Sequence, residues 1–332
     1  MNERERLRRF SPCRKSVSER KRSDGFLYPF GSYPEDKFSQ RTGYDSKFIK
    51  EGKYFYYQVV LSHERILPVL FDLLNALPEK AFIVTQIHTD DYYKENDTYV
   101  SDEPVEVEEL LRWIEGWKDV ALDDGFFGIG AFTEGPTMEV FLDEHKTIHV
   151  YHHDPDFMEE TLERLGIPFV MDLRLYWDEP HYHESLPLLT EYSEDYLTAF
   201  EDLADKYDLL LDEDEDDDTD EDGDPLGMTC WKIELRGYKP KSEFDPTPQG
   251  FYSTLYLNAE SRDDATDMVE MYMESKDEYA DLFLQMARVP EELLSAGLRR
   301  KNHDPEEPVV WFESERIEFK WNQPGGLDYR PF

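Results

Sequence analysis

The hydrophobic and polar positions of this chain follow two periods, one typical of strands and one typical of helices. β-Branched and aromatic runs predict strands in the first two thirds of the chain at 54–62, 81–88, 126–133, 137–143, 147–153 and 168–177. Helical spacing predicts helices at 64–77, 105–117, 155–166 and 190–211. The order 54–88 indicates a β-α-β unit, and the short separators after 126 indicate an antiparallel meander.

The last third of the chain shows the same two periods. Strands are expected at 228–238, 251–259 and 308–321, the last with a bulge near Glu313. Helices are expected at 261–275, 277–288 and 290–300. Asp154 and Ser261 precede two of the predicted helices and are the expected N-cap residues.

Between these two parts, 11 of the 13 residues from 212 to 224 are acidic. Such a run cannot collapse on itself, so we expect 212–226 to be a solvated linker between two domains. The predicted fold class is α+β, each domain a mainly antiparallel sheet with helices on one face. The domains are expected at 51–211 and 227–322, the second ferredoxin-like in style. A basic, largely disordered arm and aromatic strap (1–50) precede them, and a tail (323–332) follows.

Charge is the most unusual property of the composition. The net charge is -40 over 332 residues, yet residues 1–53 hold 14 basic and 8 acidic residues, a net of +6. The remainder therefore carries -40 − 6 = -46. An acidic body of this kind repels nucleic acid and attracts basic partners or cations. Surplus carboxylates are also typical of proteins adapted to high salt, which is the alternative explanation of the charge.

The chain contains only two cysteines, Cys13 and Cys230, and no apolar run long enough to span a membrane. Twin arginines near the start are not followed by an apolar segment, so no secretion signal is expected. These features favour a cytoplasmic location. Arginine-rich arms can bind RNA, but the acidic body is expected not to bind nucleic acid directly.

Histidine clustering is the main chemical signal. Six of nine histidines fall between 145 and 183. His149 and His153 share one face of a predicted strand, and His181 and His183 are likewise two residues apart. If these pairs converge, they form a divalent transition-metal site. The bland alternative is that these are surface or core histidines, since no metal-binding motif with characteristic spacing is present.

A second pattern lies in the acidic run. Asp218, Asp220 and Asp222, followed by a glycine, match the opening of an EF-hand calcium loop. Thr229 stands where the closing bidentate Glu belongs, so counterion condensation is the favoured interpretation. No complete catalytic motif is found: there is no nucleophile elbow, and Cys230 lies in an apolar strand where a thiol is usually inert. No catalytic or cofactor-binding residue is therefore assigned.

Three functions fit these observations. The leading prediction is a non-enzymatic acidic interaction protein, adaptor- or antidote-like, that engages a basic protein partner. The first alternative is a divalent-metal-dependent enzyme of the hydrolase class that uses the His149, His153, His181 and His183 region. The second alternative is a salt-adapted protein whose charge has no binding role.

Overall fold

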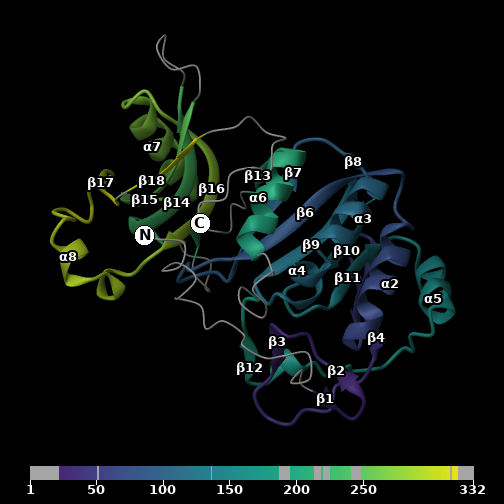
Figure 1. Cartoon of the computed structure of the whole chain (residues 1–332). Coiled ribbons are helices and arrows are strands. Elements are labelled where there is room, and N and C mark those ends of the chain that lie inside the picture. Colours follow the sequence, from purple (N-terminus) through teal and green to yellow (C-terminus); the bar gives the residue numbers. More distant parts are fainter. Residues whose placement is uncertain are drawn as a thin grey trace. The chain divides into compact units, whose positions relative to one another are not determined.

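The computed structural model describes residues 22–50, 52–135, 137–186, 195–212, 218–219, 225–240, 248–314 and 316–320 (Figure 1). The chain divides into two compact units, and each is described by itself. One unit, called here the N-terminal unit, contains the described residues up to 87 and those of 99–210. The C-terminal unit contains 88–98 and the described residues from 211 onward. The chain is thus a mixed α/β structure with several antiparallel sheets.

The larger sheet has nine strands in the order β13-β7-β6-β9-β10-β11-β5-β4, and β8 also pairs with β6. From β6 to β4 each pairing along this order is antiparallel. The strands are β4 (Gly43–Ile49), β5 (Tyr54–Val60), β6 (Lys80–His88), β7 (Asn96–Ser101), β8 (Val105–Glu106), β9 (Phe127–Glu134), β10 (Thr137–Leu142), β11 (Ile148–His152) and β13 (Leu209–Leu211). The predicted meander is confirmed as β9-β10-β11.

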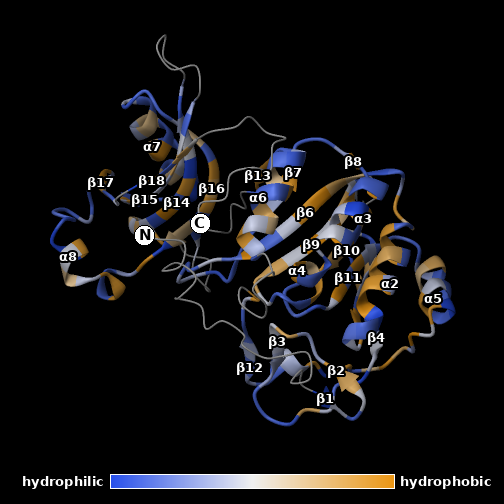
Figure 2. Ribbon diagram, viewed as in Figure 1, coloured by the Kyte–Doolittle hydropathy of each residue, from blue (hydrophilic) through white to orange (hydrophobic). Residues whose placement is uncertain are grey.

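Three helices of the N-terminal unit begin and end close to the predicted positions: α2 (His63–Leu74), α3 (Val107–Gly116) and α5 (Pro155–Arg164). Helix α6 (Tyr196–Tyr207) is shorter than the predicted helix 190–211, whose last three residues form strand β13, and α4 (Lys118–Asp123) was not predicted. Helices α2, α3 and α4 contact one another, and α2 also contacts β10. Their apolar residues form the hydrophobic bands visible in Figure 2. The β-α-β unit is confirmed as β5-α2-β6, with β9, β10 and β11 inserted between its two strands. Asp154 caps α5 as expected, because its side chain accepts a hydrogen bond from the Phe157 N–H.

The aromatic strap predicted after the basic arm is buried against the N-terminal unit. Phe26, Tyr28, Phe30 and Tyr33 are all at most 6% exposed. They lie in or beside three short strands, β1 (Arg22–Ser23), β2 (Phe26–Leu27) and β3 (Ser32–Pro34). Strand β3 pairs antiparallel with β12 (His181–His183). Residues 43–49 of the same segment form the edge strand β4, which the sequence pattern did not reveal.

The C-terminal unit is built on a five-stranded antiparallel sheet in the order β16-β14-β15-β17, with β18 also pairing with β15. Its elements are β14 (Thr229–Lys239), β15 (Gln249–Ala259), α7 (Arg262–Glu274), β16 (Tyr279–Arg288), η4 (Glu291–Leu293), α8 (Ala296–Arg299), β17 (Val310–Glu313) and β18 (Ile317–Lys320). Helix α7 packs on the apolar face of this sheet, where Trp231, Ile233 and Leu255 are fully buried. Ser261 caps α7 as predicted, accepting a hydrogen bond from the Asp264 N–H.

Two predicted elements are wrong. Most of the predicted helix 277–288 is strand β16 (Tyr279–Arg288), because pairing with β14 overrides the helix propensity of the Leu, Gln, Met and Ala residues there. Residues 168–177 do not form a continuous strand. A turn at Met171 and Asp172, the latter with a φ of 54°, interrupts the extended run, and η2 (Tyr176–Asp178) ends it.

The remaining fold predictions are met only in part. The stretch 290–300 contains the short helices η4 and α8, and 308–321 is divided into β17 and β18 near the expected bulge. After residue 228 the order is two strands, a helix, a strand, the short helices η4 and α8, and two strands, which differs from the β-α-β-β-α-β order of ferredoxin-like folds. Most of the predicted linker, including Asp220 and Asp222, lies outside the described residues. The division at 212–226 therefore stays a prediction.

Cys230 should be an unreactive thiol in the folded protein. Its side chain lies in β14, and burial raises its pKa to about 12, assisted by the nearby Glu291 carboxylate. Because the thiolate is the reacting form, the fraction available at pH 8 is small. In a Cys13→Ser variant we expect alkylation by iodoacetamide to be more than a hundredfold slower in native buffer than in denaturant. Equal rates in the two conditions would contradict the burial of this thiol.

Candidate metal centre

Two parts of the N-terminal unit bring three histidines together. The first is the turn between β10 and β11. Within this turn the Asp143 N–H donates to the Thr147 carbonyl at 3.0 Å, and Asp143 Oδ1 accepts from the Thr147 N–H at 2.7 Å. Lys146 adopts a φ of 63°, which lets the chain reverse. The turn places His145 at its tip with fixed backbone geometry.

Strand β12 supplies the other two histidines. Its register pairs His181 with Pro34 and His183 with Ser32 on β3. Because side chains alternate along a strand, His181 and His183 share one face, as the sequence predicted. Their ring centroids lie 4.9 Å apart, and those of His145 lie 5.2 Å from His181 and 4.4 Å from His183. One ring nitrogen from each histidine lies within 4.8 Å of the other two.

Buried Tyr176 connects the turn to β3. Its hydroxyl lies 2.7 Å from Ser32 Oγ and 2.9 Å from the carbonyl oxygen of His145, to which it donates a hydrogen bond. Burial raises the pKa of Tyr176 well above its ordinary value, so the hydroxyl keeps its proton as a donor. This contact fixes the backbone of His145 relative to the strand pair that carries His181 and His183.

Oxygen atoms lie beside Nδ1 in two of the three rings. His145 Nδ1 lies 3.5 Å from Asp143 Oδ2 and 3.4 Å from Glu144 Oε1. His181 Nδ1 lies 2.9 Å from the carbonyl oxygen of Glu179. Each Nδ1 thus faces acceptors, which favours the tautomer with the proton on Nδ1. In that tautomer the lone pair is on Nε2, and the two Nε2 atoms face each other at 3.3 Å.

The acidic groups beside His145 form a second layer. Burial tends to raise the pKa of Asp143, but the adjacent His149 and His145 outweigh it and hold that pKa well below its usual range. The pKa of Glu144 is raised, first by burial and then by the charge of Asp143. Asp143, Glu144 and His145 are themselves close enough to hold a cation. The acceptor positions around His145 Nδ1 suit them better to orienting that ring.

The four histidines singled out from the sequence separate into different environments. His181 and His183 lie in the cluster. His149 lies outside the cluster and contacts Asp143 instead. Its Nε2 lies 2.8 Å from Asp143 Oδ2 and its Nδ1 lies 2.6 Å from the Tyr56 hydroxyl. Both of its ring nitrogens are engaged, so it supports Asp143. His153 is exposed and stacks on His152 with ring centroids 4.8 Å apart, away from the cluster.

His145 is the member of the cluster that sequence reasoning missed. It lies in a separator between two strands, so period-two spacing assigns it to no face. The sequence signal that could have pointed to His145 was its position in a short turn, two residues after Asp143. The calcium pattern meets no comparable geometry in the described residues. Asp218 accepts hydrogen bonds from the Arg262 N–H at 3.1 and 3.2 Å, and Asp220 and Asp222 lie outside the description.

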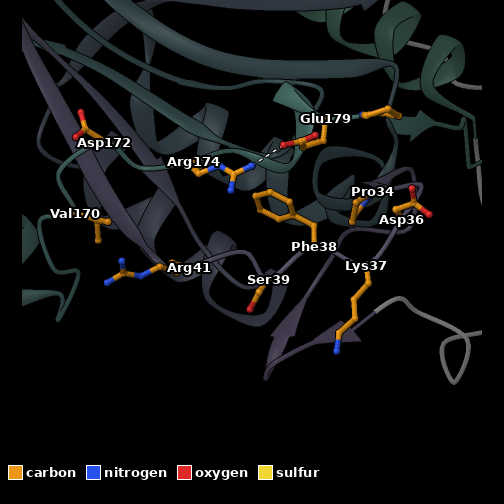
Figure 3. A pocket seen from close by; sticks show the side chains of 11 residues that line it. Pro34, Asp36, Lys37, Phe38, Ser39, Arg41, Val170, Asp172, Arg174 and Glu179 are labelled. Atoms are coloured by element: carbon orange, nitrogen blue, oxygen red, sulfur yellow. Dashed lines mark hydrogen bonds and ion pairs between the residues drawn. The ribbon is translucent and has the colours of Figure 1, made fainter.

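A pocket of about 560 Å³ adjoins the segment that carries His181 (Figure 3). Glu179 and Pro180, which line it, immediately precede His181. Arg174 donates to Glu179 Oε1 at 2.6 Å, and its guanidinium lies 5.6 Å from the centre of the Phe38 ring. The pocket is lined by equal numbers of basic and acidic side chains, Lys37, Arg41, Arg174, Asp36, Asp172 and Glu179. It offers space for a small polar molecule next to this segment.

Comparison with protein-family models, with curated proteins and with solved structures finds no match to this chain. No helix in the described part of the chain has both the length and the apolar character needed to cross a bilayer.

Proposed function

We propose that this protein binds a divalent transition-metal ion, for example zinc, through His145, His181 and His183. The observation that carries the proposal is the pair of facing Nε2 atoms at 3.3 Å, each on a ring whose Nδ1 faces an acceptor. Two lone pairs at that distance repel unless a proton or a metal ion lies between them, and a metal ion can use the third histidine as well. Two nitrogens bound to one tetrahedral zinc ion at about 2.0–2.1 Å are themselves about 3.3 Å apart.

The surroundings support a metal in a second way. Metal-bound histidines usually donate their other ring N–H to a carboxylate or a backbone carbonyl. His145 has Asp143 and Glu144 in this position, and His181 has the carbonyl of Glu179. Three protein ligands leave one tetrahedral position for water or substrate, which is the arrangement of catalytic rather than structural zinc sites.

A hydrolase is the enzyme class that such a centre supports best. A metal ion in a three-histidine site lowers the pKa of bound water and supplies a nucleophile at neutral pH. The chain itself would orient the ligands through Asp143 and Tyr176 and offer the pocket beside Glu179 for a polar substrate. The other two predictions, an acidic partner-binding protein and a salt-adapted protein, remain separate from this proposal, and metal binding excludes neither.

Metal affinity of histidine variants tests the proposal. In protein purified without a histidine tag, we expect one zinc ion per chain by mass spectrometry of the metal content. His181→Ala and His145→Ala should each weaken zinc binding about a hundredfold, because each removes one of three ligands. His153→Ala is the matched control, since it removes an exposed histidine outside the cluster, and it should leave the affinity unchanged.

Two results would contradict the metal site. One is wild-type protein that binds no zinc, cobalt or manganese stoichiometrically in a titration with a competing chelator. The other is an equal loss of affinity in His181→Ala and His153→Ala, which would indicate binding by scattered surface histidines. His149→Ala should have an intermediate effect of about tenfold, because it removes a partner of Asp143 rather than a ligand.

A further inference from the structure

A groove of about 730 Å³ lies between helix α5 and the segment that follows it, on the N-terminal unit and apart from the histidine cluster. Its two walls differ in chemistry. One wall is acidic and belongs to α5, and the other is formed mainly by aromatic and aliphatic groups. The lining residues are Asp156, Glu159, Glu160 and Glu163 on the first wall and Tyr44, Gly166, Ile167, Pro168 and Phe169 on the second.

The acidic wall is a single stripe along α5. Asp156, Glu159, Glu160 and Glu163 are spaced i, i+3, i+4 and i+7, so they lie on one side of the helix, and all four are exposed. Figure 2 shows hydrophilic residues along α5. Among the described residues no Lys, Arg or His side chain forms an ion pair with any of the four. Like charges at this spacing destabilise a helix by a few tenths of a kcal/mol per pair, and of the four only Asp156, in the first turn, interacts favourably with the helix dipole.

The apolar wall is held in place by backbone hydrogen bonds. The Tyr44 N–H donates to the Pro168 carbonyl at 3.0 Å, and the Val170 N–H donates to the Tyr44 carbonyl at 2.8 Å. The rings of Tyr44 and Phe169 are 5.5 Å apart in an edge contact, and the Phe169 side chain is 51% exposed. Burial raises the pKa of Tyr44, and Glu159 and Glu163 raise it further. The charges of Glu159 and Glu163 are therefore felt at the aromatic wall across the groove.

We propose that this groove binds arginine or lysine side chains of a basic segment in a partner protein. The carboxylate stripe neutralises the cationic heads. The exposed ring of Phe169 offers a face for a cation and apolar surface for its methylene stem, and the buried Tyr44 ring contacts Phe169 edge-on. A concave site with one acidic and one aromatic wall binds a basic side chain at a defined place, whereas the overall negative charge attracts basic peptides to no particular place.

Binding of a labelled peptide to the full chain tests this groove. The probe is a fluorescent dodecapeptide of alternating arginine and glycine, measured by anisotropy at about 50 mM salt. We expect Glu159→Gln/Glu163→Gln to weaken binding at least tenfold and Phe169→Ala to weaken it at least threefold. The matched control, Glu108→Gln/Asp119→Asn, removes the same charge from exposed positions on α3 and α4 and should change the affinity less than twofold.

Three outcomes would overturn the proposal. The first is no binding of the probe to the wild-type chain. The second is equal weakening in the groove and control variants, which would assign the affinity to net charge and favour salt adaptation. The third is a tenfold gain in affinity when Arg8 and Arg9 are both replaced by Gln in the full chain. That gain would make the chain's own basic arm the occupant. All three measurements are independent of zinc, so they leave the metal proposal unaffected.

Discussion

We expect Asp97→Ala to lower the free energy of unfolding by about 3–5 kcal/mol, because it removes one partner of a buried ion pair. Asp97 is fully buried in the C-terminal unit and its Oδ1 lies 2.8 Å from Arg262 Nη2. Lys94 Nζ lies 3.0 Å from the same oxygen. Arg262 is itself only 1% exposed, so water cannot replace the missing carboxylate. Chemical denaturation of the full chain measures the change.

A second substitution separates a charge effect from simple loss of packing. In Asp97→Ala/Arg262→Met the buried cation is removed together with the Asp97 carboxylate, so the double variant should be more stable than Asp97→Ala alone. Asp267→Ala is the control, because Asp267 is exposed on α7 in the same unit, and it should change stability by less than about 0.5 kcal/mol. A double variant less stable than the single one would show that Arg262 is held by interactions other than this ion pair.

The buried ions of the C-terminal unit also show why its composition was hard to interpret. Arg288 Nε lies 3.0 Å from Asp91 Oδ2, and Lys232 Nζ lies 3.0 Å from Asp90 Oδ2. Asp90, Asp91 and Asp97 belong to the segment 88–98, more than a hundred positions from Lys232, Arg288 and Arg262 along the chain. In the sequence this segment is a polar loop rich in Tyr and Asp. Nothing local indicates that some of its carboxylates are structural, so all of them were counted as surface charge.

Local patterns predicted the parts of the fold that local chemistry decides. The caps at Asp154 and Ser261 and the meander β9-β10-β11 follow from a few adjacent residues, and all three are confirmed. Strand β16 was missed because its sequence has good helix formers and its state is decided by pairing with β14, some fifty residues earlier. The turn at Asp172, which has a positive φ, interrupts the predicted strand 168–177.

In the candidate metal centre, too, some features follow from local sequence and others depend on contacts between distant segments. The parity of His181 and His183 could be predicted, since side chains two apart on a strand share a face. Their approach to His145 depends on the pairing of β12 with β3 and on the Tyr176 contact, both between distant segments. The groove beside α5 was also beyond prediction. Its acidic stripe is visible in the sequence, but the facing wall requires Tyr44 to pair with residues 168–170.

The second large effect is expected at a backbone junction that holds β12 in place. We expect Gly31→Ala to cost roughly 3 kcal/mol of the free energy of unfolding, at the upper end of ordinary overpacking. A Cβ at Gly31 would lie 2.3 Å from the Gly125 nitrogen, 2.4 Å from the Glu184 oxygen and 2.5 Å from the Asp123 oxygen. All three are backbone atoms, so no rotamer change relieves the contact.

The backbones at this junction are joined by three hydrogen bonds, which couple the junction to the metal centre. Gly31 N–H donates to Asp123 at 2.8 Å, Glu184 N–H donates to Gly31 at 2.8 Å, and Gly125 N–H donates to Glu184 at 3.0 Å. Glu184 directly follows His183. Relieving the clash must displace this backbone, so Gly31→Ala should also weaken zinc binding about tenfold while the three histidines remain present.

A glycine without close neighbours provides the control for this variant. No atom lies within 4 Å of a Cβ placed at Gly116, the exposed last residue of α3 in the same unit. Gly116→Ala should therefore be neutral or stabilise the protein by up to about 1 kcal/mol, since alanine loses less backbone entropy in a helix. Thermal melting and zinc titration of both variants measure the two effects. A Gly31→Ala variant that melts and binds zinc like Gly116→Ala would show that the junction neither restricts the backbone nor positions His183.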